Sequence, residues 1–397
     1  MALKTQKLTE QLELFGCIQC GKCTGGCPVA RKTTLNMRTL IYHMLVDANM
    51  DVDAHQELWD CTACFTCVER CPKDVEPAEL IISLRGELVE SGRVPETLGT
   101  ALMGIFRQGN PSGMARQDRE LWAEGMEESL ERAKGLASHA GSAQEECELL
   151  YFVGCIPSYD QRIQPVARAL LRTFERAGLD PGTLGTRESC CGNEVRRMGE
   201  AGLFGMLVEE NGELLRGVGA RQLVTTSPHC FNTFRKEYGL DGMEVLHYTQ
   251  LLARLIEQGE LTFPEPSEAR PVEHRTVTYH DPCFLGKQNQ IYDEPRAILE
   301  AIPGLKLVEM DRRRERSLCC EGGGGRMWVE GTNLQERLAF QRVQEAAETG
   351  ADTLAVACPF CLLTLEDAVK VQGLDEELCV MDIMELVDIA LEEDLDP

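Results

Sequence analysis

A pair of adjacent cysteines constrains this chain more than any other feature of its sequence. Cys319 and Cys320 are followed by one glutamate and then by four consecutive glycines, residues 322–325. Neighbouring side chains leave an extended strand on opposite faces, so a turn is needed to bring both sulfurs to one centre. Glycine lacks a Cβ atom, which lets the backbone pass close to a bulky group. The segment therefore predicts a turn that surrounds a centre held by sulfur.

Three further thiols accompany this pair at the ends of apolar runs. Cys283 follows the run 277–282, and Cys358 and Cys361 follow the run 353–357. An α/β module presents ligands in this way, at the carboxyl edge of its sheet. The candidate ligands of one centre are Cys283, Cys319, Cys320, Cys358 and Cys361.

The same pattern occurs once upstream, so the chain contains an internal duplication. Its candidate metal ligands are Cys155, Cys190, Cys191 and Cys230. Ser227 stands where the alignment with Cys358-Pro359-Phe360-Cys361 requires a cysteine. A serine hydroxyl is a poor iron ligand, because its oxygen is hard and its pKa far exceeds the ~8.5 of a thiol. Four cysteines can still hold a four-iron cluster, so the first copy is either a relay or empty.

Two further cysteine runs lie near the start of the chain, at residues 17–28 and 61–72. Each has the spacing CxxCxxCxxxCP, which is typical of ferredoxins that hold two 4Fe–4S clusters. In that motif the fourth cysteine of each run binds the cluster of the other run. We assign cluster one to Cys17, Cys20, Cys23 and Cys71, and cluster two to Cys61, Cys64, Cys67 and Cys27. Zinc knuckles or redox CxxC sites would be alternatives for a single run, but two identical runs favour two cubane clusters.

Segments with apolar residues at helical spacing follow each of these runs. Apolar residues recur at helical intervals over 35–46, and Pro77 is well placed to open a helix over 77–85. These patterns predict an α-helical ferredoxin rather than a β-hairpin one. His43 and His55 are interpreted as surface or packing residues, because the cysteines already complete the ligand sets.

The pattern of elements predicts an α+β multidomain protein. We expect an α-helical ferredoxin domain at 1–95, a connector at 96–147, a first α/β cysteine-rich module at 148–260 and a second at 272–397. A charged helix is predicted over 119–134 in the connector. Each module is expected to alternate strands and helices around a parallel sheet, and residues 380–396 to form a closing amphipathic helix.

Composition excludes several functions. The chain has 397 residues, 19 cysteines and a formal net charge of −25, so no basic face is available for nucleic acid. No glycine-rich phosphate loop follows a strand, and no apolar run reaches the roughly 18 residues of a membrane span. With no export signal apparent, the cysteines are more consistent with metal ligands than with disulfides. We expect a cytoplasmic protein, free or held at the inner face of the membrane by a partner.

The combined motifs resemble the D subunit of heterodisulfide reductase, or its fused C and B subunits. The strings CIQCGKCTGGCP and DCTACFTCVERCPKDV resemble the ferredoxin part. The strings YHDPCFLGKQNQIYDEPR and SLCCEGGGGRMW resemble the cysteine-rich domains, with the motif CCG, that also occur in iron–sulfur subunits of glycolate, lactate and anaerobic glycerol-3-phosphate dehydrogenases. The resemblance implies a noncubane 4Fe–4S cluster on the five thiols of the second copy. Glu321 departs from the glycine of CCG, and Ser227 from the fifth cysteine.

Two classes of function follow from this resemblance. In the first, the chain is an oxidoreductase subunit that cleaves a disulfide at the five catalytic cysteines, with His280 as a candidate proton donor beside Cys283. In the second, it only transfers electrons between a flavoprotein dehydrogenase or reductase and a quinone or cytochrome partner. Without a flavin fold or haem motif it needs other redox subunits, such as a flavoprotein, a hydrogenase-like subunit or a membrane cytochrome b.

Overall fold

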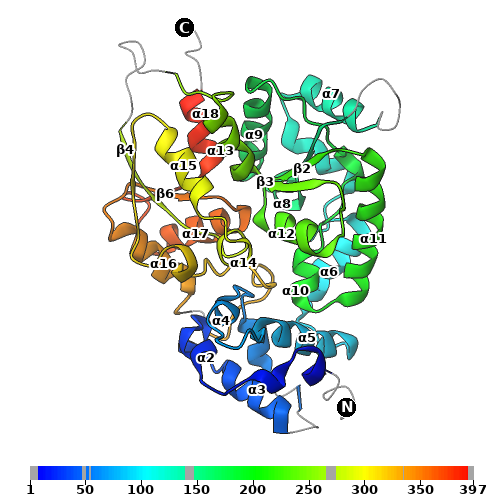
Figure 1. Cartoon of the computed structure of the whole chain (residues 1–397), viewed down its shortest axis with the longest axis vertical. Helices are drawn as coiled ribbons and strands as arrows, with labels where there is room; N and C mark the ends of the chain where they lie inside the picture. Colours follow the sequence, from blue (N-terminus) through cyan, green and yellow to red (C-terminus); the bar gives the residue numbers. More distant parts are fainter. Residues whose placement is uncertain are drawn as a thin grey trace.

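The computed structural model describes residues 8–46, 51–52, 55–138, 147–264, 274–333 and 335–391. Figure 1 shows a helical end at the bottom, formed by the start of the chain, with two α/β modules side by side above it. The first module is drawn mainly in cyan and green, and the second in yellow, orange and red.

The described part of the ferredoxin domain is helical, as the spacing of apolar residues predicted. Leu40, Ile41 and Met44 are buried on one side of α3. Pro77 occupies the first turn of α5, where its missing N–H is not needed. The α-helices are α2 (Lys22–Gly26), α3 (Met37–Val46), α4 (Thr66–Glu69) and α5 (Pro77–Glu90), with 3-10 turns η1 (Leu14–Gly16), η2 (Val29–Arg31) and η4 (Gln56–Asp60).

The connector packs onto the first module. It contains α6 (Glu96–Gln108), the 3-10 segment η5 (Arg116–Ala123) and α7 (Glu127–Ser138). The single charged helix expected over 119–134 is wrong, because Gly125 adopts a left-handed φ of 81° and separates η5 from α7. Trp122 in η5 is buried, with its ring edge-on to Tyr151. Residues 139–146 of the predicted connector lie outside the described part.

The first module contains a parallel sheet in the order β1-β2-β3. Its strands are β1 (Leu149–Phe152), β2 (Gln222–Thr225) and β3 (Glu244–His247). Its helical segments are α8 (Cys155–Tyr159), α9 (Gln164–Arg176), η6 (Gly185–Arg187), α10 (Asn193–Met198), α11 (Ala201–Val218), α12 (Pro228–Glu237) and α13 (Tyr248–Gln258).

The second module contains a parallel sheet in the order β5-β4-β6-β7. Its strands are β4 (Arg275–Tyr279), β5 (Leu305–Val308), β6 (Thr353–Val356) and β7 (Cys379–Asp382). Its helical segments are α14 (Gly286–Asn289), α15 (Asp293–Ala301), η7 (Arg314–Arg316), α16 (Leu338–Ala347), α17 (Pro359–Val371) and α18 (Ile383–Leu391).

The two copies differ at the position of β5. Strand β5 pairs with β4, but its counterpart in the first module is reduced to a single parallel bridge between Leu150 and Gly182. The edge strands β3 and β7 were not predicted. Strand β7 occupies the first part of the helix expected over 380–396, which begins instead at Ile383, and residues 392–396 lie outside the described part.

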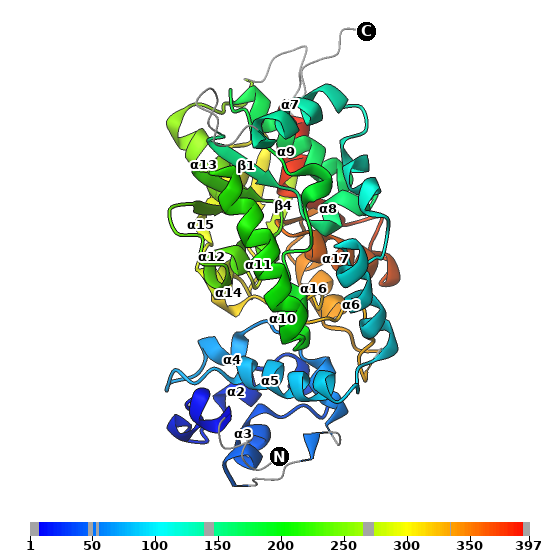
Figure 2. The ribbon, with the colours of Figure 1, turned by 90° about the vertical axis from the view of Figure 1, so that its right-hand side faces the viewer.

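The two modules share one hydrophobic core. Helix α9 packs against α18 and α13 against α15, so that helices of each module cover the other (Figure 2). Arg162 of the first module donates hydrogen bonds to Glu366, at 3.1 Å, and Glu385, at 2.7 Å, of the second. The modules are therefore one packed body, and the carboxyl ends of β1, β2, β4 and β6 all lead into cysteine segments.

Candidate iron–sulfur centres

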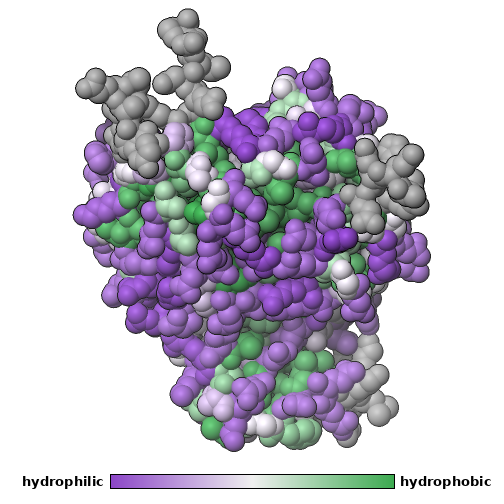
Figure 3. All heavy atoms as spheres, turned by 45° about the horizontal axis from the view of Figure 1, so that its top comes forward, coloured by the Kyte–Doolittle hydropathy of each residue, from purple (hydrophilic) through white to green (hydrophobic). Residues whose placement is uncertain are grey.

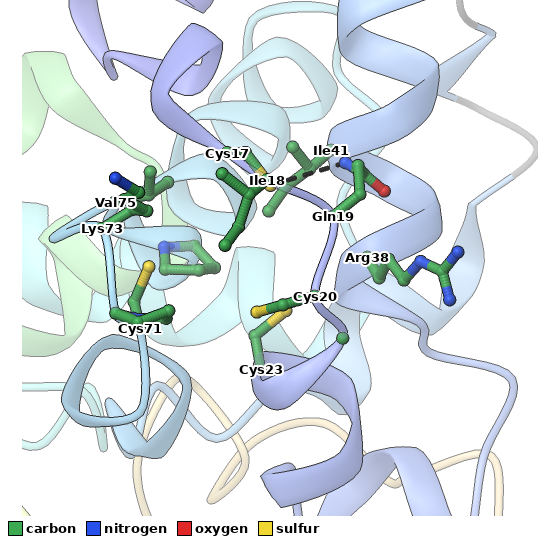
Figure 4. A pocket seen from close by; sticks show the side chains of 13 residues that line it. Cys17, Ile18, Gln19, Cys20, Cys23, Arg38, Ile41, Cys71, Lys73 and Val75 are labelled. Carbon is green, nitrogen blue, oxygen red and sulfur yellow. Dashed lines mark hydrogen bonds between the residues drawn. The ribbon is translucent and has the colours of Figure 1, made fainter.

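The first ferredoxin run and the last cysteine of the second run line one cavity. Figure 4 shows Cys17, Cys20 and Cys23 together with Cys71, which comes from the opposite side of the cavity. Cys20 is exposed, whereas Cys17, Cys23 and Cys71 are partly buried. These are the four thiols that the motif assigns to cluster one.

The second run lies deeper in the molecule. Burial, together with the nearby thiols of Cys64 and Cys61, raises the pKa of the Cys27 thiol to about 12. Burial also holds the pKa of Cys67 well above its usual value, with added repulsion from Cys61, Cys64 and Cys27. Four thiols that repel one another in a buried place form a donor set suited to a metal such as iron, whose charge would offset that repulsion.

The backbone of both runs is shaped in the same way. Gln19 and Ala63, the third residues of the two runs, have left-handed φ values of 55° and 49°. Gly21 and Phe65, the fifth residues, have φ values of 77° and 60°. A left-handed non-glycine residue costs on the order of 1–3 kcal/mol and is concentrated at functional sites. The Ala63 N–H donates to the Cys61 sulfur at 3.4 Å, as expected of a loop that stabilises thiolates.

The five thiols of the second module gather at the ends of β4 and β6. The Cys320 and Cys361 sulfurs lie 3.2 Å apart, and a nitrogen of His280 lies within 4.8 Å of both. Hydrogen bonds from Cys319 and Cys361 lower the pKa of Cys320 well below its usual value. Burial raises the pKa of the Cys358 thiol, but hydrogen bonds from Cys361 and His229 outweigh it and lower the value to about 5.

His280 is held in one tautomer. Arg342 Nε donates to its Nδ1 at 2.9 Å, and an arginine is always a donor, so the ring proton resides on Nε2. Burial and the neighbouring Arg342 charge keep the pKa of His280 well below its usual value. With Nδ1 engaged by Arg342, the ring keeps its N–H group at Nε2.

The backbone conformation and hydrogen bonds of Glu321 show how a glutamate can replace the glycine of the CCG motif. It has a left-handed φ of 76°, close to the 80° of Gly192 at the equivalent place in the first copy. Its carboxylate accepts hydrogen bonds from Arg326 and from the Leu338 N–H, both at 3.0 Å. This partly buried ion pair offsets the strain that a glycine would avoid.

The first module brings its four predicted thiols together in a second cavity. Cys155, Cys190, Cys191 and Cys230 line this cavity with Ser227, and all are buried. Ser227 caps α12, and its Oγ accepts from the His229 N–H at 3.3 Å. The serine thus has a structural hydrogen bond at the position where the second module has a fifth thiol.

The second ferredoxin run touches the second module directly. Cys319 Sγ lies 3.4 Å from Thr62 Oγ1. Cys319 also forms a hydrogen bond with Cys64, and this bond contributes most to the raised pKa of the Cys64 thiol. A Cβ added at Gly324 would lie 2.7 Å from the Cys61 carbonyl oxygen, and one at Gly323 would lie 3.0 Å from that of Thr62. The glycine run is therefore required by the close approach of the ferredoxin loop.

Sequence reasoning missed one residue that holds this contact together. Arg85 in α5 is fully buried and donates to the carbonyl oxygens of Leu58, Cys61, Arg197 and Gly324. No local pattern distinguishes Arg85 from a surface arginine on a helix, so the sequence carried no signal for it.

The fold and these thiols define an iron–sulfur redox protein with a ferredoxin end and a duplicated cysteine-rich domain. Residues 13–75 match the family described as a 4Fe-4S dicluster domain, and residues 149–235 and 277–366 each match the cysteine-rich domain family CCG. The D subunit of dihydromethanophenazine:CoB–CoM heterodisulfide reductase from Methanosarcina barkeri is 30% identical over 423 residues, which cover 98% of this chain and 97% of that protein. The chain belongs to the family formed by the D subunits of heterodisulfide reductases and related iron–sulfur oxidoreductases.

Other relatives are longer than this chain. A probable iron-sulfur-binding oxidoreductase, FadF, from Bacillus subtilis is 36% identical over 85% of the chain, and an EtfAB:quinone oxidoreductase from Syntrophomonas wolfei is 32% identical over 96%. The chain spans 47% and 58% of the length of these two proteins. Among the described residues, no helix is both long and apolar enough to cross a membrane.

Proposed function

We propose that this chain conducts electrons between a redox partner at its ferredoxin end and the second cysteine-rich module. The observation that carries the proposal is the contact of Thr62 and Cys64, in the second ferredoxin run, with Cys319. Thiols from two cluster sites are neighbours there, in a part of the molecule from which solvent is largely excluded. The domain division at 1–95, 96–147, 148–260 and 272–397 is part of this proposal.

The ligand sets that we propose are those of the motifs. Two cubane clusters would be held by Cys17, Cys20, Cys23 and Cys71, and by Cys61, Cys64, Cys67 and Cys27; one noncubane cluster would be held by Cys283, Cys319, Cys320, Cys358 and Cys361. Such clusters supply one-electron transfer when bound. The protein holds the thiols, covers them with backbone N–H groups, as Glu321 and Gly322 do for Cys319 and Cys320 at 3.3 and 3.4 Å, and keeps water out.

Disulfide reduction is the first candidate for the chemistry at the second module. It consumes two electrons and two protons, breaks one S–S bond and yields two thiols. It is supported by the relatives named as D subunits of heterodisulfide reductase, which match the chain over almost their whole length. In this role His280, which has a ring nitrogen within 4.8 Å of the Cys320 and Cys361 sulfurs, would be the candidate proton donor.

Electron transfer alone is the second candidate. Four of the five thiols are buried, and the one partly exposed thiol, Cys283, lies beside Cys319 close to the ferredoxin domain. A relative named EtfAB:quinone oxidoreductase points to a quinone-linked partner. A flavoprotein, hydrogenase-like or membrane cytochrome b subunit would supply or accept the electrons, and a membrane-bound partner would bring the chain to the membrane.

Spectroscopy of the anaerobically purified protein separates these candidates. If the second module reduces a disulfide, adding a disulfide or a thiol should change the electron paramagnetic resonance signal that is lost in Cys320→Ser. An unchanged signal, together with rapid reduction by a flavoprotein or quinone partner, would favour electron transfer alone.

The exchange of the fourth cysteine between the two runs gives a testable prediction. Cys27→Ser should disturb the cluster held mainly by the second run and spare the cluster held by Cys17, Cys20 and Cys23. Cys71→Ser is the matched variant and should have the opposite effect. Iron content and the electron paramagnetic resonance signals of the two reduced cubane clusters show which cluster is lost in each variant. Loss of the cluster held by the run that contains the substituted cysteine would contradict the assignment.

The exposed cluster site marks the end at which a partner docks. Ile18, which lines the cavity with the exposed Cys20, is 59% exposed, and Phe15, two residues before Cys17, is 70% exposed. Residues 14–46 contain no Asp or Glu, although the chain has 65 in total, and the charged residues that line the cavity are Arg38 and Lys73. Figure 3 shows hydrophobic side chains gathered at the lower, ferredoxin end of the molecule. An apolar patch with basic residues favours an acidic redox protein as the partner.

The double variant Arg38→Glu and Lys73→Glu tests this docking face. We expect reduction by the partner to slow by at least about tenfold at low salt, because the charge reversal acts on the encounter rate. The difference should diminish as salt is added. Reduction by an uncharged small-molecule reductant is the control and should not change. An equal partner rate in the variant and the wild type at low salt would place the docking site elsewhere.

A further inference from the structure

The duplicated CxxC segments face each other across the boundary between the two modules. His229 in the first copy occupies the position of Phe360 in the second, and Ser227 occupies that of Cys358. The His229 and Phe360 rings lie 4.6 Å apart between centroids, and His229 also stacks on Phe284 of the second module at 4.2 Å. The two copies thus present different side chains to one another at equivalent places.

His229 is held firmly in this position. Its ring is buried, and Nδ1 lies 2.9 Å from the Glu194 carboxylate, which follows Cys190 and Cys191 in the first module. The other Glu194 oxygen accepts from the Gly325 N–H at 2.7 Å, so the same carboxylate binds the glycine run of the second module. With Nδ1 engaged by Glu194, Nε2 is the ring nitrogen left for another partner.

That partner is a thiol of the other module. His229 lies close enough to Cys358, the cysteine that has no counterpart in the first copy, for the thiol to raise the pKa of His229 and for the imidazole to lower the pKa of Cys358. Both rings line the cavity of the first module together with Ser227. The imidazole therefore lies between that cavity and the extra thiol of the second module. Of the two rings, the one that can donate a hydrogen bond is the one beside the additional sulfur.

We propose that His229 is a positioning residue through which the first cysteine-rich module donates a hydrogen bond to the Cys358 sulfur and raises the reduction potential of the centre in the second module. The inference rests on the proposed function, since it requires a cluster on the five thiols. A hydrogen bond to a ligand sulfur stabilises the reduced state, which carries one more negative charge. The first module would then matter for the second whether or not it holds a cluster itself.

Potentiometric titration of the iron-loaded full chain, followed by electron paramagnetic resonance, tests the proposal. His229→Phe introduces the residue already present at position 360 and should lower the midpoint potential of the second-module centre. We expect at least a tenfold shift in its reduction equilibrium, about 59 mV for a one-electron couple. His229→Gln, which keeps an N–H donor, should shift the equilibrium by less. The two cubane clusters serve as the internal reference and should not move.

One control variant and one second variant complete this test. Phe284→Leu removes the stacked ring but not the donor, and should change the equilibrium by less than about threefold. His229→Leu, which removes the donor with a smaller side chain, should lower the potential in the same direction as His229→Phe, and it gives a second test if His229→Phe fails to fold. Unchanged potentials in both variants would overturn the inference. If the Cys320→Ser variant contains as much iron as the wild-type protein, the proposed function is contradicted rather than this inference.

Discussion

Cys320→Ser should abolish turnover, by at least about a hundredfold, and remove the iron of the second module. The Cys320 sulfur lies at the centre of the thiol group, 3.2 Å from that of Cys361, and accepts a hydrogen bond from the Gly322 N–H. Hydrogen bonds from neighbouring thiols lower its pKa, which favours the thiolate form that binds iron. A serine oxygen at this place is hard and protonated, so it cannot replace the sulfur.

Cys191→Ser is the matched variant in the first module. Cys191 is buried in the equivalent position, but its set lacks the fifth thiol because of Ser227. We expect this variant to keep measurable turnover with a disulfide or the native acceptor. Iron analysis and steady-state rates of both variants distinguish the modules. Full activity in Cys320→Ser, combined with an inactive Cys191→Ser, would mean that the first module carries the chemistry.

The ferredoxin runs and the duplicated cysteine pattern were readable from the sequence because the ligand spacing is local. The thiols of each run lie within about a dozen residues, and their helices begin at recognisable residues such as Pro77. The short edge strands β3 and β7 were missed, because four residues give too few alternations to distinguish a strand from a helix start. The break at Gly125 was also missed, since an isolated glycine is compatible with a charged helix.

The contacts between domains could not be predicted from the sequence. His229 lies inside the aligned CxxC segment, and the exchange of histidine for phenylalanine was a signal that it differs from its counterpart. What it bonds to depends on how the two modules pack, which no local pattern encodes. Arg85 has partners 27, 112 and 239 residues away in the chain, so its role appears only in the folded molecule.

Arg85 occupies the place where three parts of the molecule meet. Its guanidinium donates five hydrogen bonds to carbonyl oxygens of the segment around the second ferredoxin run, helix α10 and the glycine run, at 2.6 to 3.1 Å. It also lies over the Trp59 ring, 5.1 Å from its centroid. Burial lowers the pKa of Arg85, and no carboxylate accepts a hydrogen bond from it among the contacts of the described residues. Carbonyl dipoles and the aromatic ring therefore hold the charge.

Arg85→Met should destabilise the iron-loaded protein by at least about 3 kcal/mol, because each buried carbonyl left without a donor costs about 1–3 kcal/mol. Methionine keeps the length and apolar packing of the side chain, so the loss reports on the hydrogen bonds. We expect faster hydrogen exchange at the second ferredoxin run and the glycine run, and slow electron transfer between the ferredoxin clusters and the second module, while iron content stays near normal. Arg107→Met, on the exposed face of α6, is the control and should change stability by less than about 0.5 kcal/mol. Equal unfolding midpoints for the two variants would show that Arg85 does not join the ferredoxin domain to the modules.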